Sequence, residues 1–361
     1  MLFALNQVQN CNLELMEEIP DAFFNSIETS ADYGFHMFPA WFKTERGAQT
    51  NGLYGEGLNL FNLIKASGRE ADIVKWYTDY KNIDQHSRDT TTTVNYLTAI
   101  SQELHDAAKT FFSSLYKAFD SFWFTEYANI DVRKYIRDFK KTNDVYFCPI
   151  CGVETIPHGS REARSALDHW FCKAKYPFLG VYLNNLIPMG AGCNNPPRKG
   201  EKELIYTDNS RSKRQEFYYP FVYDGEVEVI LKCLREPTNI EDDCGEWVFQ
   251  FKGVNAEHQA LIDRWSSFFE ISARWIEEVL ELYVLSWTNE VVNVIRESQL
   301  EIDNESSYRK AIEFLQSTKK ELHTSPFNRV QWHFLEFMLT TASVGLFEAY
   351  RSIVKENLIF E

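Results

Sequence analysis

The stretch that decides the fold contains "ALDHWF" (166–171) and "NNLIPMGAGCNN" (184–195), followed by "PPRKG" (196–200). The apolar runs here are of strand length, and prolines, glycines and asparagines surround them. These features predict a small domain of short strands and loops. Asp168 and His169 are neighbours, so strand alternation points their side chains to opposite faces and gives them different roles.

Upstream of this stretch lies "CPICG" (148–152), with Cys148 and Cys151 in the spacing of half a zinc site. The chain has seven cysteines in 361 residues. So few cysteines, in an odd number, suit reduced thiols and one metal site better than a disulfide framework. We therefore expect a cytoplasmic protein.

Four pairs in this region occur in the order in which HNH endonucleases carry them: Cys148/Cys151, Asp168/His169, Asn185/Leu186 and Cys193/Asn194. The nine-residue step from Asn185 to Asn194 also matches that family. The region therefore resembles the HNH module, or ββα-metal fold, over about 80 residues. "DHWFCKAKYP" (168–177) and "YYPFVYDGEV" (218–227) are similar to segments of a bacterial subgroup.

The resemblance implies a site for phosphodiester hydrolysis. His169 would be the general base that takes a proton from water, and Asn185 would hold the loop of His169 in position. Asp168 and Asn194 would bind a catalytic metal. Their oxygen atoms are hard ligands, which favour Mg²⁺ or Mn²⁺ over zinc. The expected products carry a 5′-phosphate and a 3′-hydroxyl.

The resemblance also implies a separate structural zinc ion at Cys148, Cys151 and Cys193. The family has a second Cys-x-x-Cys, but Gly190 stands where its first cysteine belongs. A tetrahedral zinc ion then needs a fourth ligand, or the cysteines are simply buried without metal. Candidates for that ligand are Cys172, His158, Cys233 and Cys244. Pro196 and Pro197 fit a helix only in its first turn, so Asn195 is an alternative to Asn194 as a metal ligand.

Charge is distributed unevenly along the chain. Residues 132–214 hold 15 Lys and Arg against 8 Asp and Glu, or +7, whereas the whole chain has 37 against 52, or −15. The other residues therefore sum to −22. A basic centre between acidic flanks indicates a surface for nucleic acid. Lys173, Lys175, Arg198 and Lys199 are the candidates for phosphate contacts.

The flanks have helical periodicity. Apolar residues recur at three- and four-residue steps in 94–122, and a second stripe runs from Leu261 to Leu282. A short helix is predicted over 130–140. The fold class is therefore α+β: a mostly helical chain with an embedded ββα-metal module. The predicted domains are 1–142 (helical), 143–230 (nuclease) and 231–361 (helical).

We therefore expect a metal-dependent HNH endonuclease acting on DNA or RNA, an effector in a prokaryotic defence or mobile-element system. The alternative is a catalytically inactive, zinc-stapled module that binds nucleic acid or a protein. The aromatic, acidic flanks suggest a protein partner, such as an ATPase or a sensor, through Trp265, Trp275, Trp287 and Trp332. No apolar run is long enough to span a membrane, and no signal peptide is expected.

Overall fold

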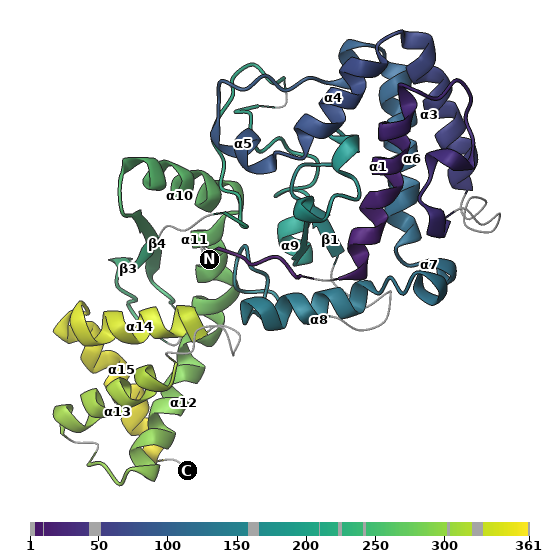
Figure 1. Ribbon diagram of the computed structural model, residues 1–361. Helices are drawn as coiled ribbons and strands as arrows, with labels where there is room; N and C mark the ends of the chain where they lie inside the picture. Colours follow the sequence, from purple (N-terminus) through teal and green to yellow (C-terminus); the bar gives the residue numbers. More distant parts are fainter. Residues whose placement is uncertain are drawn as a thin grey trace. The chain divides into compact units, whose positions relative to one another are not determined.

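The computed structural model describes residues 4–9, 11–42, 52–157, 166–208, 210–222, 226–240, 243–301, 304–319 and 328–359 (Figure 1). Within these residues the chain is mostly helical and carries two small antiparallel sheets of two strands each. The predicted α+β class is confirmed at this level. In the described ranges, no helix combines the length and the apolar character needed to cross a membrane.

The fold divides into two compact units, each built from segments that are separate in the sequence. The N-terminal unit takes in residues 4–143 and 156–223, and the C-terminal unit takes in residues 144–155 and 224–361. This division differs from the predicted order of three consecutive domains. In particular, the predicted boundary after residue 230 falls inside a strand, Val227–Arg235.

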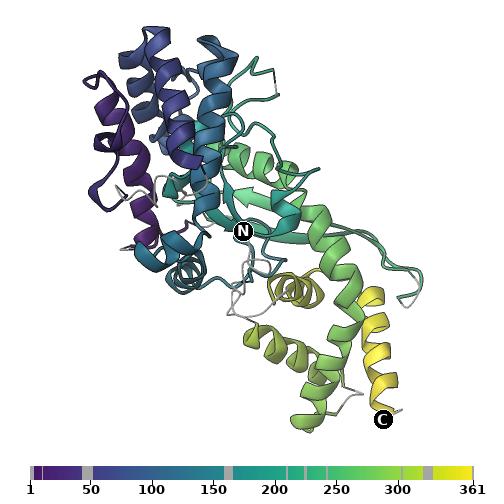
Figure 2. The ribbon, with the colours of Figure 1, turned by 90° about the vertical axis from the view of Figure 1, so that its right-hand side faces the viewer.

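The N-terminal unit begins with helices that lie side by side in Figures 1 and 2. Its α-helices are α1 Leu15–Ile27, α3 Leu53–Ser67, α4 Glu70–Tyr80, α5 Ile83–Arg88, α6 Gln102–Ala118, α7 Phe122–Tyr127 and α8 Val132–Asn143. Short 3₁₀ turns lie at Asn12–Glu14, Phe35–Met37, Ala40–Phe42, Leu97–Ala99, Pro177–Leu179 and Leu183–Asn185. Helix α8 confirms the short helix predicted over 130–140, shifted by two or three residues.

Helix α6 occupies the centre of the stripe predicted over 94–122. It begins at Gln102 because Ser101 caps it, with Ser101 Oγ accepting the Leu104 N–H at 3.0 Å. Phe111 and Leu115 on its inner face are fully buried. The α6 stripe is therefore core, as its spacing predicts.

The stretch "ALDHWF … GAGCNN" forms a small ββα arrangement in the same unit. Strand β1 (Ala166–His169) pairs antiparallel with β2 (Leu186–Met189), and α9 (Ala191–Asn194) follows one residue after β2. His169 lies opposite Leu186 in the register. These strands appear where the sequence predicts them.

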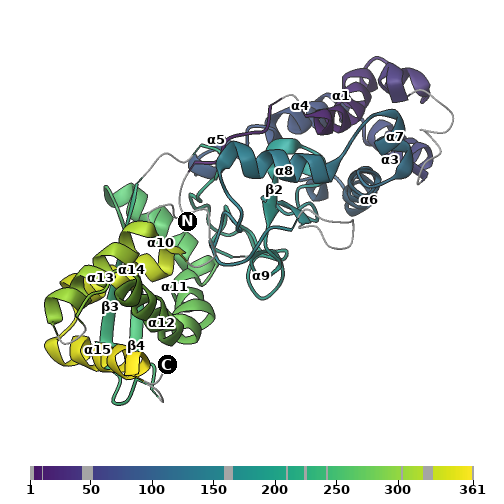
Figure 3. The same cartoon turned by 90° about the horizontal axis from the view of Figure 1, so that it is seen from below.

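The C-terminal unit contains a β-hairpin and a set of packed helices, labelled in Figure 3. Strand β3 (Val227–Arg235) pairs antiparallel with β4 (Glu246–Gly253), a strand that was not expected from the sequence. The helices are α10 Ala256–Phe268, α11 Ile271–Trp275, a π-helical turn Ile276–Leu280, α12 Glu281–Glu297, α13 Glu305–Thr318, α14 Asn328–Thr340 and α15 Val344–Ile359. Figure 2 shows α12 and α15 running side by side.

The stripe from Leu261 to Leu282 is not one straight helix. Glu270 adopts a left-handed backbone conformation (φ 55°), which separates α10 from α11, and a π-turn precedes α12. These changes rotate the helix face, so Leu282 is 66% exposed instead of buried.

The tryptophans expected to receive a partner are mostly core residues. Trp265, Trp275 and Trp287 are buried, and Trp332 is half-buried. These tryptophans therefore belong to the packing of the C-terminal unit, and they do not support a docking surface there.

Candidate active site

His169 ends β1 with its imidazole held by a backbone carbonyl. Its Nε2 lies 2.8 Å from the Gly180 oxygen. A carbonyl oxygen only accepts, so Nε2 carries the hydrogen in this contact and Nδ1 is left as the acceptor nitrogen. The Tyr116 ring packs 4.6 Å from the imidazole. Burial, together with the charges of Lys173 and Lys199, lowers the pKa of His169 to about 3, so the ring is neutral.

Asn185 fixes the loop that provides this carbonyl. Its Oδ1 accepts the Phe171 N–H at 2.7 Å, and its Nδ2 donates to the oxygens of Phe171 (3.0 Å) and Leu179 (3.2 Å). The side chain is fully buried. Asn185 therefore ties the segment after His169 to the turn before Gly180.

Gly180 is a glycine because the chain passes very close to α6 there. A Cβ at this position would lie 2.9 Å from Phe112 Cβ and 3.0 Å from the Pro177 oxygen. The carbonyl that binds His169 is thus positioned by direct backbone packing.

Asp168 forms a buried ion pair with Lys199. Lys199 Nζ lies 2.7 Å from Asp168 Oδ2, and the two side chains are 1% and 9% exposed. Burial raises the pKa of Asp168, and the charge of Lys199 opposes that rise. The turn after α9 brings Lys199 here: its N–H donates to the Cys193 oxygen at 3.3 Å, and Gly200 N–H donates to the Asn194 oxygen at 2.8 Å.

Asn194 is the last residue of α9. The helix stops after one turn because Pro196 and Pro197, which follow closely, have no N–H to continue it. Asn194 is half-buried and Asn195 is exposed.

The four basic residues expected to contact phosphates differ in their surroundings. Lys199 is buried against Asp168, and Lys175 lies 3.5 Å from Glu203. Arg198 donates to the Gly192 oxygen at 3.1 Å. Lys173 is half-buried, with its ammonium 4.4 Å from the Tyr116 ring centroid. Lys199 is therefore buried with its carboxylate partner, whereas Lys173, Lys175 and Arg198 are each partly exposed.

The turn that carries Cys148 and Cys151, called the cysteine knuckle below, belongs to the C-terminal unit. Cys148 N–H donates to the Glu154 oxygen at 2.7 Å, and Gly152, with φ +71°, donates to the Cys148 oxygen at 2.8 Å. The indole N–H groups of Trp265 and Trp275 donate to the oxygens of Ile150 (3.2 Å) and Cys151 (2.8 Å). These contacts fix a tight turn of the kind that presents two thiols to one ion.

Cys148, Cys151 and Cys193 are buried and form a group of three thiols that could hold a metal ion such as zinc. Among the described residues, Cys172 is buried but is not a member of this group. Cys233 and Cys244 lie on the β-hairpin and in its loop, outside the group. His158, another candidate for the fourth ligand, falls outside the described residues.

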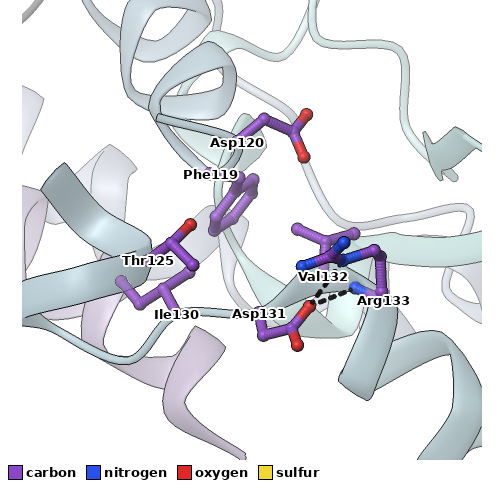
Figure 4. A pocket seen from close by; sticks show the side chains of 7 residues that line it. All are labelled: Phe119, Asp120, Thr125, Ile130, Asp131, Val132 and Arg133. Atoms are coloured by element: carbon purple, nitrogen blue, oxygen red, sulfur yellow. Dashed lines mark hydrogen bonds and ion pairs between the residues drawn. The ribbon is translucent and has the colours of Figure 1, made fainter. Parts of the chain in front are cut away.

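A separate pocket of about 190 Å³ lies at the start of α8 (Figure 4). Asp131 is one of the residues that line this pocket. Its Oδ1 caps α8 by accepting the N–H groups of Arg133 (2.9 Å) and Lys134 (3.1 Å). Figure 4 shows Asp131 directed at Arg133, while Asp120 points elsewhere. The carboxylate already has its partners, so this pocket is not a second candidate site.

Sequence reasoning missed the part of the site that comes from α6. Tyr116 OH donates to the Leu167 oxygen at 2.6 Å and its ring faces His169. Tyr116 belongs to a helix expected only to form core, some 50 residues upstream of β1. No local motif signals such a contact; only its position beside the buried stripe could have suggested it.

Comparisons of the chain with protein-family models, with curated proteins and with solved structures found no match.

Proposed function

We propose that this chain is a metal-dependent endonuclease of the HNH type that hydrolyses phosphodiester bonds of DNA, with RNA as a second possible substrate. One observation carries the proposal: Gly180 holds His169 Nε2 at 2.8 Å, and Asn185 braces the same loop. A neutral imidazole oriented in this way leaves Nδ1 as the ring nitrogen that would take the proton from water.

In the proposed reaction, water attacks phosphorus and gives its proton to His169 Nδ1. The bond between phosphorus and the 3′ oxygen breaks, and that oxygen takes a proton from solvent water, which yields a 5′-phosphate and a 3′-hydroxyl. Fixing the imidazole in advance favours the reaction because no reorganisation is needed when the proton moves.

Asp168 and Asn194 are the proposed ligands of Mg²⁺ or Mn²⁺, since both offer hard oxygen atoms. The buried Asp168 Oδ2 already faces a cation, the ammonium of Lys199. The position therefore favours positive charge. A divalent ion bound there would stabilise the charge on the phosphate and on the leaving oxygen.

We also propose that Cys148, Cys151 and Cys193 hold a structural zinc ion. Thiolates are preferred zinc ligands, and a small module with two four-residue strands gains stability from such a staple. A role as effector in prokaryotic defence, beside a protein partner such as an ATPase or sensor, remains part of the proposal. The exposed side chains of Leu282 and Leu285 on α12 support only the protein-partner part of this proposal.

The second candidate function is a nucleic-acid-binding module that no longer cuts. The Lys199–Asp168 pair favours it, because a lysine on the carboxylate takes the place that a catalytic metal needs.

A plasmid-nicking assay with Mg²⁺ or Mn²⁺ separates the two functions. We expect the wild-type chain to nick DNA and His169→Ala to lose nearly all nicking while it still binds DNA. Equal nicking by both proteins would contradict the role of His169. Binding without nicking by the wild type, with either metal, would favour the non-cutting module.

A further inference from the structure

Helix α6 forms one side of the candidate active site. The Tyr116 hydroxyl is bonded to β1 through the Leu167 oxygen, and its ring lies 4.6 Å from His169. Residues exposed on α6 next to Tyr116 are therefore close to any phosphate that reaches the site.

Three lysines gather on this side. Lys109 and Lys117 are exposed on α6, and Lys173 places its ammonium 4.4 Å from the Tyr116 ring. Eight residues of helix separate Lys109 from Lys117, which corresponds to about 12 Å along the axis. The charges of Lys117 and Lys109 also act on Lys173, where both add to the effect of burial in lowering its pKa.

These lysines differ from other lysines on the helices of the N-terminal unit. Lys75 pairs with Asp79, and Lys134 pairs with Asp138, both at 2.5 Å. By contrast, Lys109, Lys117 and Lys173 form no ion pair with any residue that the structure describes. Lys117 lies within electrostatic range of Glu56, and Lys173 within that of Asp168, but neither lysine forms an ion pair with these carboxylates. In a chain of net charge −15, such neighbouring ammonium groups are available to an external anion.

We propose that Lys109, Lys117 and Lys173 form a track for the phosphate backbone of duplex DNA, leading along α6 to His169. A separation of about 12 Å matches three to four steps of a strand whose charges repeat roughly every 3.4 Å. The cation–π contact with Tyr116 holds Lys173 at the end nearest the site. The track rests on the proposed nuclease function and deepens it, because it places the DNA on a helix outside the ββα arrangement.

The test measures binding of a labelled DNA duplex by fluorescence anisotropy across a series of salt concentrations. The full chain carries His169→Ala so that the DNA stays intact. Lys109→Gln with Lys117→Gln is compared with a matched control, Lys75→Gln with Lys134→Gln, which removes two lysines that already have carboxylate partners. Lys109→Arg with Lys117→Arg keeps the charge.

We expect the Lys109/Lys117 glutamine variant to weaken binding and to reduce the salt slope by about 2, one unit for each lysine that no longer neutralises a phosphate. The control and the arginine variant should keep the parent slope. The proposal is overturned if the glutamine variant and the control have the same slope and affinity, or if the parent binds no duplex. Nicking by the wild-type chain is read separately, so the track can fail while the nuclease function stands.

Discussion

At the scale of single residues, the site depends on buried polar groups whose partners are backbone atoms. Asn185 makes three such hydrogen bonds and His169 makes one, all to the loop between β1 and β2. Partners on the backbone cannot rotate away, so these bonds define the position of the imidazole closely. The same bonds make the site sensitive to substitution.

Asn185→Ala should lower the free energy of unfolding by about 2–4 kcal/mol, because the Phe171 N–H and two carbonyls would be left buried without their partner. Urea unfolding of both proteins measures the difference. The control is Asn184→Ala, which removes one half-buried contact to Tyr182 and should cost less than about 1 kcal/mol. Equal destabilisation by the two substitutions would contradict the special role of Asn185.

Glu17 on α1 should make stability depend on pH. It accepts the Leu183 N–H at 2.7 Å, and burial raises its pKa from 4.5 to about 7. The folded state therefore holds this proton more tightly than the unfolded chain. Stability from this group is present below pH 4.5 and is lost as pH rises towards 7, by at most about 3 kcal/mol.

Glu17→Gln keeps an acceptor for Leu183 and should flatten this dependence, measured as the free energy of unfolding between pH 4.5 and 7. Glu18→Gln is the matched control, because Glu18 is the exposed neighbour. A Glu17→Gln profile as steep as that of the wild type would refute the assignment.

At the scale of elements, the contact of α6 with the 3₁₀ turn Pro177–Leu179 connects the helical part to the site. Phe112 on α6 lies against Gly180, and the Gly180 carbonyl binds His169. A shift of α6 would therefore be transmitted to the imidazole through one residue.

Gly180→Ala should destabilise the protein by about 1–3 kcal/mol, since the added methyl meets Phe112 at 2.9 Å. Gly55→Ala in α3 is the opposite case, because nothing lies within 4 Å of its added methyl. It should stabilise the protein by about 0.5–1 kcal/mol. Thermal unfolding of both variants gives the comparison, and a neutral Gly180→Ala would contradict the close packing.

Local patterns in the sequence predicted the elements that have strong periodicity. Strands β1 and β2 and the core stripe of α6 were found from apolar spacing alone. Strand β4 was missed, although "EWVFQFKG" (246–253) alternates buried and exposed residues over much of its length. The break at Glu270 was also missed, because a glutamate at positive φ has no sequence signal.

The motifs in the sequence named individual residues of the candidate site, and no residue outside the motifs was named. Asn185 forms hydrogen bonds within the loop after His169, whereas no motif indicated that Asp168 would pair with Lys199. Lys199 was assigned to phosphate contact from its charge and position, whereas the turn after α9 carries it into the interior. A one-dimensional pattern cannot show where a short turn directs a long side chain.

At the scale of the whole molecule, the proposed zinc ion would raise the stability of the folded chain against unfolding. We expect native mass spectrometry to find one zinc ion per chain, and Cys148→Ser to lose it with a lower unfolding temperature. Cys244→Ser is the control, because Cys244 is exposed and outside the group. Zinc retained by Cys148→Ser, or lost equally from Cys244→Ser, would exclude this ligand set.

On the ribosome, the turn that carries Cys148 and Cys151 is synthesised well before the tryptophans that bond to it. Ile150 and the indole of Trp265 that binds its carbonyl are 115 residues apart. At roughly 5–20 residues per second, Ile150 is synthesised about 6–23 s before Trp265. During that interval the Ile150 carbonyl has no indole donor, so the turn that carries Cys148 and Cys151 gains this hydrogen bond only late in synthesis.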